Sequence, residues 1–83
     1  MITSVAMLYK GSIVVVPRPG RHHDIIEVLA RGGEPTPVVG EQGFVNENGN
    51  FLNRKEALCE AIRCNQLIRK TNPKDRLFSE DLW

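Results

Sequence analysis

Basic side chains stand at two places where the sequence predicts that a helix begins. Arg21, His22 and His23 open one predicted helix, and Arg54 and Lys55 open the other. The helix dipole disfavours cations at this end by about 0.3–1 kcal/mol each. The same end presents free backbone N–H groups, so bases beside it make a pocket for an anion. If the two helix starts lie close together, Arg21, His22, His23 and Arg54 could hold a phosphate or a nucleotide.

These bases could also have a purely structural role. In this interpretation they are ordinary solvated surface charges, or they pair with the acidic residues near the end of the chain. Ser79, Glu80 and Asp81 could reach them within one chain or across a dimer. In that case the pairing is structural, and an exposed pair contributes little to stability.

The residue types for catalysis or metal binding do not form a known pattern. His22 with Asp24 could do general acid–base work, because histidine titrates near neutrality. No nucleophile motif and no nucleotide-binding glycine loop accompanies them. Adjacent helix positions diverge by roughly 100°, so His22 and His23 do not easily hold one metal ion. The sequence therefore predicts no catalytic residue, no metal and no cofactor, and a small histidine-dependent hydrolase or transferase remains an alternative.

The cysteines and the hydropathy indicate a cytoplasmic protein. Cys59 and Cys64 are five residues apart and fit neither a CxxC redox pair nor a zinc knuckle, so we expect buried, reduced, structural thiols. The sequence shows no signal peptide and no apolar run of roughly 18 residues, so it predicts no membrane segment.

Length and charge narrow the class of protein further. The 83 residues predict a single domain spanning 1–83, small enough that a subunit interface would be a natural source of extra stability. We therefore expect a homo-oligomer. The formal net charge of +1 argues against duplex nucleic acid as a partner, because proteins that bind duplexes carry a clear basic excess.

The first half of the chain predicts a hairpin followed by a helix. Residues 5–9 and 12–16 are β-rich runs around Gly11, and the unbroken apolar run of the second predicts a central strand covered on both faces. Residues 21–31 predict a helix that ends at Gly32. The following loop, residues 34–42, has room for a short extended piece at Val38 and Val39.

The second half repeats this order. Residues 43–52 predict a hairpin with a type I′ turn at Asn48 and Gly49. A helix over residues 54–68 follows, capped by Asn53 and Glu56 and broken at residues 71–73. The apolar side chains of the tail should dock rather than stay exposed. The sequence thus predicts an α+β fold, in which two hairpins form a small antiparallel or mixed sheet packed against two helices, with a docked C-terminal tail.

The sequence resembles a group of small proteins found in phage and prophage genomes. The residues that carry the resemblance are Arg21-His22-His23-Asp24-Ile25, then Gln42-Gly43-Phe44, then the pattern GxFLxRxEA over residues 49–57, and the ending LFSEDLW over residues 77–83. The resemblance covers most of the chain and implies a context rather than an activity. Small phage proteins without catalytic motifs often act on host machinery, by binding a host protein or by sequestering a signalling molecule.

The leading functional hypothesis is a non-catalytic phage protein of the host cytoplasm that binds an anionic small ligand. Its most plausible ligand is a nucleotide of host anti-phage defence. Phe44, Phe51 or Trp83 could supply a face on which a base stacks. The main alternative is an inhibitor or adaptor that binds a host protein, as anti-CRISPR proteins do, with the apolar tail as its contact.

Overall fold

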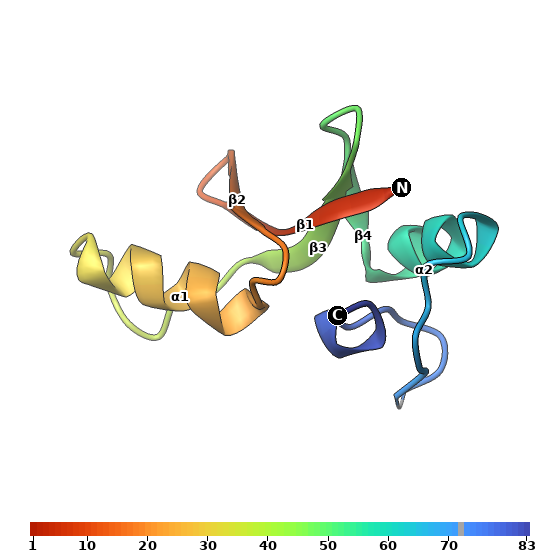
Figure 1. Ribbon diagram of the computed structural model, residues 1–83. Helices are drawn as coiled ribbons and strands as arrows, with labels where there is room; N and C mark the ends of the chain where they lie inside the picture. The colour runs from red at the N-terminus through yellow and green to blue at the C-terminus, as the bar shows by residue number, and fades with distance from the viewer. Residues whose placement is uncertain (72) are drawn as a thin grey trace.

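The computed structural model describes residues 1–71 and 73–83 and has the expected α+β class. Four antiparallel strands form one sheet in the order β2-β1-β3-β4. Figure 1 shows the two helices at opposite ends of the sheet and the C-terminal segment between them. In chain order the elements are β1 (Ile2–Tyr9), β2 (Ser12–Pro17), α1 (His22–Arg31), β3 (Glu41–Asn46), β4 (Phe51–Asn53), α2 (Arg54–Arg63) and the short 3-10 helix η1 (Ser79–Asp81).

The two hairpins turn in different ways, and the expected type I′ turn at Asn48 and Gly49 is wrong. Gly49 has a φ of 79°, but Asn48 is not among the described residues with positive φ. Instead Asn46 pairs with Asn50 across a three-residue loop, and its side-chain Oδ1 accepts hydrogen bonds from the N–H groups of Asn48 and Asn50, both at 3.0 Å. The turn with two positive φ values is the β1–β2 turn, where Lys10 has a φ of 50° and Gly11 one of 81°.

The expectation that the strand over residues 12–16 is central is also wrong. This strand is β2, at the edge of the sheet, where Ile13 is 46% and Val15 is 43% exposed. The interior strands are β1 and β3, and the β1 residues Val5, Ala6 and Met7 are fully buried. Residues 5–9 of β1 and 13–17 of β2 are both apolar runs, and such a run does not reveal whether a strand has one neighbour or two.

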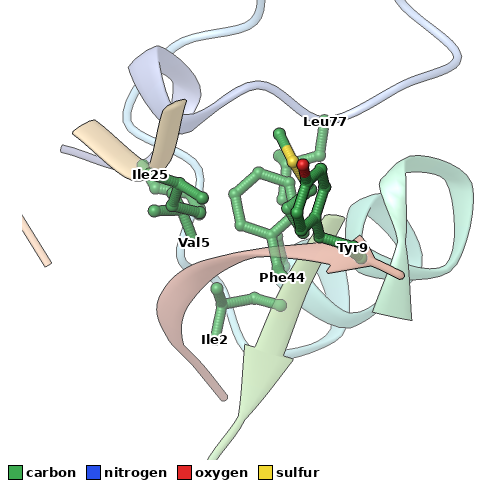
Figure 2. Close-up of a cluster of buried hydrophobic side chains, with 10 residues drawn as sticks. Ile2, Val5, Tyr9, Ile25, Phe44 and Leu77 are labelled. Carbon is green, nitrogen blue, oxygen red and sulfur yellow. The ribbon is translucent and has the colours of Figure 1, made fainter. Parts of the chain in front are cut away.

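Side chains of the sheet divide between a core face and an open face. On the core face Val5, Met7 and Phe44 pack against both helices, with α1 over β1 and β2 and α2 over β3 and β4. Figure 2 shows Leu77, from the C-terminal segment, beside Phe44 in this core. The open face carries the alternate positions, which are Ser4, Ala6, Leu8, Ile13, Val15, Pro17, Glu41, Gly43, Val45, Phe51 and Asn53. Ser4, Ala6, Gly43 and Val45 among them are buried within the chain.

Helix α1 matches the expected helix over residues 21–31 to within one residue. Arg21 is its N-cap, with its backbone N–H bonded to Asp24 Oδ2 at 2.7 Å, and Gly32 is its C-cap. The expected extended piece at Val38 and Val39 is absent from this described segment: residues 34–40 hold no strand, and Val39 is 76% exposed.

Helix α2 begins as expected but ends five residues early. Asn53 Oδ1 accepts hydrogen bonds from the N–H groups of Lys55 and Glu56, which is the expected N-terminal cap. The helix ends at Arg63 because Asn65 takes a left-handed conformation, with a φ of 56°. The N–H of Gln66 then bonds to the carbonyl of Ala61 at 2.8 Å, as in a Schellman cap. The break expected at residues 71–73 includes residue 72, which lies outside the described residues.

The C-terminal tail docks on the core of its own chain, with Leu77 and Leu82 buried. Its anchor is Asp81, which is fully buried. The Asp81 carboxylate accepts hydrogen bonds from the N–H and hydroxyl of Thr71, from the N–H of Phe78 and from Lys70 Nζ. Burial by itself would raise the pKa of Asp81, but these donors outweigh it and lower the pKa.

Two further expectations concern the helices and the thiols. No helix among the described residues is long and apolar enough to span a bilayer. The expectation that both cysteines are buried is wrong, because Cys59 is exposed and Cys64 is only partly buried. Cys59 lies on the outer side of α2, whose buried residues are Ala57 and Ala61.

Candidate functional site

Two cavities lie where the starts of α1 and α2 meet β3 and the tail. Their volumes are about 270 and 290 Å³, and they share Gln42 and Arg54. We call the pair the Arg54 groove. The first cavity is also lined by Glu41, Asn53, Lys55 and Arg76, and the second by His22, His23, Ile26, Phe78, Ser79 and Glu80.

Arg54 is the first residue of α2 and holds the middle of the groove in place. Its guanidinium donates hydrogen bonds to the carbonyl oxygen of Leu77, at 2.7 Å, and to the side-chain oxygen of Gln42. The guanidinium carbon lies 4.3 Å from the centre of the Phe78 ring. Burial lowers the pKa of Arg54, although the group stays charged at neutral pH. A fixed, desolvated cation is a favourable partner for an anionic group.

His22, the first residue of α1, is 8% exposed and lies on the floor of the second cavity. Its Nε2 is 2.7 Å from the carbonyl oxygen of Gly43, and because a carbonyl only accepts, Nε2 must carry the proton. The ring meets Phe44 edge-on, with centroids 5.1 Å apart. Burial, together with the charge of Arg54, lowers the pKa of His22. The imidazole is therefore neutral at pH 7.

A neutral, buried His22 should make stability fall in mild acid. Its pKa in the folded chain lies below the ordinary value of 6.5, so below pH 6.5 the unfolded chain binds a proton that the folded chain resists. Stability is then fully present above pH 6.5 and decreases as the pH falls, by at most about 1.4 kcal/mol per pH unit. Urea midpoints measured on both sides of pH 6.5 check this prediction.

The matched control for that measurement is the neighbouring histidine. His22→Gln should remove the loss of stability between the two pH values, whereas His23→Gln should keep it, because the His23 side chain is 74% exposed. A His22→Gln protein that is as sensitive to pH as the unsubstituted chain would show that other groups cause the effect.

Arg21 lies behind the groove and binds the tail instead of lining a cavity. Its guanidinium donates to the Ser79 hydroxyl, at 3.2 Å, and to the main-chain oxygen of Trp83, and it lies 3.7 Å from Glu80. Ser79 in turn donates to Glu80 Oε1 at 2.8 Å, which lowers the pKa of Glu80. The structural pairing of the tail with the bases is thus present at Arg21.

The structure brings three of the seven candidate residues to the groove: His22, His23 and Arg54. The three aromatic candidates lie elsewhere. Phe44 is fully buried beneath His22, and Phe51 is on the open face of the sheet.

Trp83 completes the set of candidate residues. It packs against the core and donates from Nε1 to the carbonyl oxygen of Gly20 at 2.9 Å. The aromatic ring that borders the groove is that of Phe78.

Gln42, Phe78 and Arg76 were not expected as site residues, and Lys55 was noted as a base at a helix start but was not among the seven candidates. Gln42 is signalled by strand alternation, which puts a polar side chain on the core face between the buried Phe44 and the loop. No local pattern distinguishes Arg76 from the other bases near it, because the fold of the tail is what carries it to the groove. The described residues contain no group of three or more His, Cys, Asp or Glu side chains that could hold a metal ion.

Comparison with known proteins identifies the family. The profile of the phage T4 y16D protein matches residues 1–83. The chain belongs to this phage protein family. The match confirms the resemblance to small phage proteins carried by the motifs around Arg21 and Arg54. No curated protein and no solved structure was found to match the chain.

Proposed function

We propose that this phage protein binds an anionic small molecule of the nucleotide class in the Arg54 groove and holds it without reaction. The observation that carries the proposal is the gathering of bases in the first cavity. Arg54, Lys55 and Arg76 line it with a single acid, Glu41. Phosphate oxygens would bind the fixed guanidinium of Arg54 and the two solvated bases beside it, Lys55 and Arg76.

The second cavity differs in character and suits the uncharged part of such a ligand. Ile26 and Phe78 give it apolar walls, and His22 is a neutral ring on its floor. A nucleotide would place its phosphate against Lys55 and Arg76 and its base against Ile26 and Phe78, on either side of Arg54. Each cavity is near the lower end of the roughly 300–1,000 Å³ typical of ligand pockets. Together the two cavities fit a ligand with one anionic part and one uncharged part.

Retention of the ligand is favoured over catalysis by the state of the groove's hydroxyl and imidazole groups. Ser79 is the one lining residue with a hydroxyl, and its proton is directed to Glu80 rather than to a histidine. The Nε2 proton of His22 is held by Gly43. A histidine-dependent hydrolase would need an activated nucleophile here. In a phage, binding alone would sequester a nucleotide signal of host defence in the host cytoplasm.

The test is the melting temperature of ligand-free protein in the presence of nucleotides and cyclic nucleotides. The 260/280 nm absorbance ratio first shows that no nucleotide was carried through purification. A ligand at ten times its Kd should add about 1.4 kcal/mol of stability, which raises Tm by roughly 6–11 °C in a domain of this size. No shift with any member of the panel would overturn the proposal.

Charge-reversal variants locate the binding. The double variant Lys55→Glu and Arg76→Glu should bind at least tenfold more weakly, because each lost charged contact is worth about 1.5–3 kcal/mol. Lys74→Glu with Arg18→Glu makes the same change in net charge at exposed positions outside the groove and should bind normally. Equal losses in the two double variants would point to net charge instead of the groove.

A protein–protein inhibitor or adaptor is the second candidate function, favoured by the apolar open face of the sheet. Leu77 and Leu82 of the tail are buried in the protein's own core and so are not free to make the contact. Ile13 and Val15 remain exposed on the open face. Recovery of one stoichiometric host protein with the purified chain would support this function.

A further inference from the structure

We propose that the second cavity of the Arg54 groove selects guanine as the uncharged part of the ligand, through the Glu80 carboxylate and the Nδ1 atom of His22. This assignment rests on the proposed function, to which it adds the identity of the base. Both side chains present a lone pair, and no proton, to the cavity that they line. Such a cavity favours a group that donates hydrogen bonds.

The ring of His22 supplies the first acceptor. Its Nε2 carries the proton that bonds to the Gly43 carbonyl, so Nδ1 of the neutral ring has a lone pair. Nδ1 has no hydrogen-bond partner among the described residues, yet no buried side-chain nitrogen or oxygen in that part of the chain lacks one. Nδ1 must therefore reach open space, and the open space that His22 lines is the second cavity. An acceptor free on a ring that is only 8% exposed favours a ligand that donates to it.

The carboxylate of Glu80 supplies the second acceptor. Its contacts with other residues use Oε1, which accepts from the Ser79 hydroxyl at 2.8 Å and lies 3.7 Å from a nitrogen of Arg21. Within the part of the chain that the structure describes, no other residue donates to Oε2. The bond from Ser79 lowers the pKa of Glu80, so the group is ionised at neutral pH and acts as an acceptor only. One oxygen thus holds the carboxylate in place, and the other is open to a ligand.

The charge of Glu80 also decides which end of the ligand enters the second cavity. Three bases and one acid line the first cavity. In the second, the positive charge of Arg54, which both cavities share, is opposed by Glu80, and His22 is neutral. A phosphate group would be repelled by the Glu80 carboxylate, because like charges in close contact are unfavourable. The phosphate therefore belongs in the first cavity and the base in the second.

Acceptors in the second cavity discriminate among the nucleotide bases. Guanine has two neighbouring donors, N1–H and the 2-amino group, on one edge. Adenine and cytosine have an amino group next to a ring nitrogen that is itself an acceptor, and uracil has an N–H between two carbonyl oxygens. A carboxylate repels these acceptors, so guanine is the base that can donate to Glu80 from adjacent groups. The apolar walls, Ile26 and Phe78, suit any flat base and leave the selection to the acceptors.

The test compares the affinities of nucleoside diphosphates for the ligand-free protein by titration calorimetry. Guanosine diphosphate should bind at least tenfold more tightly than adenosine diphosphate, because it makes charge-assisted hydrogen bonds that adenine cannot make. Inosine diphosphate lacks the 2-amino group and should lose most of this advantage. The 2′-deoxy form of guanosine diphosphate should bind as tightly as the ribose form, because the acceptors are assigned to the base.

The outcomes separate this assignment from the proposed function. Equal affinity for the guanine, adenine and inosine diphosphates would overturn the selection of guanine and leave binding of an anion in the groove intact. A loss of affinity confined to the 2′-deoxy form would assign the acceptors to the sugar, and it would overturn the selection too. No binding by any of these diphosphates would overturn both proposals. This comparison uses the unsubstituted protein and needs no variant.

One substitution and a matched control locate the selectivity. Glu80→Gln keeps the length of the side chain but removes its charge, so the Kd for guanosine diphosphate should rise at least tenfold, whereas adenosine diphosphate should bind as well or better. The Glu80 side chain is 59% exposed, so the variant should fold, and its urea midpoint checks this. Glu27→Gln makes the same change in charge at a half-exposed position outside both cavities and should keep the preference for guanine. Unchanged selectivity in folded Glu80→Gln, or an equal loss in Glu27→Gln, overturns the assignment.

Discussion

Replacing Asp81 with alanine is expected to lower the free energy of unfolding by about 3–5 kcal/mol. The carboxylate is fully buried and accepts hydrogen bonds from Thr71, Phe78 and Lys70. Removing it leaves the Lys70 ammonium, whose side chain is 20% exposed, without its 3.1 Å partner. In a domain of this size the loss corresponds to a drop in Tm of roughly 12 °C or more. Urea denaturation and calorimetry measure it.

A second substitution separates charge from shape at the same position. Asp81→Asn keeps the volume but turns an N–H₂ group toward donors, so it should be nearly as destabilising as alanine. Asp75→Asn is the control, because Asp75 is 66% exposed and lies 3.7 Å from Arg76; a change within about 0.5 kcal/mol is expected there. If Asp81→Asn proves as mild as Asp75→Asn, the tail is held by its apolar side chains alone.

Phe44→Ala should have an effect of similar size, about 3–5 kcal/mol, through loss of packing. The ring is fully buried at the centre of the core face, between Val5 and Leu52 on the neighbouring strands and beneath His22. Alanine would leave a cavity between the sheet and the helices, and the side chains around this cavity are already packed against both layers. Circular dichroism during urea titration measures the change.

The comparison for Phe44→Ala is a truncation at an exposed site. Val39→Ala removes apolar atoms from a side chain that is 76% exposed, and its effect should stay within about 0.5 kcal/mol. The variant Phe44→Leu should recover most of the loss by refilling the space. Stability close to normal in Phe44→Ala would mean that the core is organised around another residue.

Local signals in the sequence predicted the elements well. Asn53 and Glu56 predicted the start of α2, and Gly32 the end of α1, because a helix cap depends on side chains within a few residues. The early end of α2 was missed, although Asn65 is of a residue type that tolerates the left-handed conformation found there. The β3–β4 turn was missed because Asn46, outside the expected dipeptide, competes for its amides.

Arrangement in space could not be predicted to the same degree. The place of β2 at the edge depends on which strand β1 pairs with on its other side, and that partner, β3, is more than thirty residues away. For the site, the bases at the helix starts indicated His22, His23 and Arg54. The pairing of the bases with residues 79–81 was an alternative, but no local pattern showed that Arg21 would be the base that binds Ser79 and Trp83, since these partners lie about sixty residues along the chain.

The attachment of the tail to both helix starts has a consequence for the order in which the protein assembles. Arg21 binds residues 58 and 62 positions further on, and Arg54 binds Leu77. Closing such long loops costs chain entropy, and no short-range contact offsets this cost. These contacts should therefore form late in folding. A chain with its hairpins and helices in place but its tail undocked has no Arg54 groove. Only a chain that has completed its fold could therefore bind a ligand in the groove.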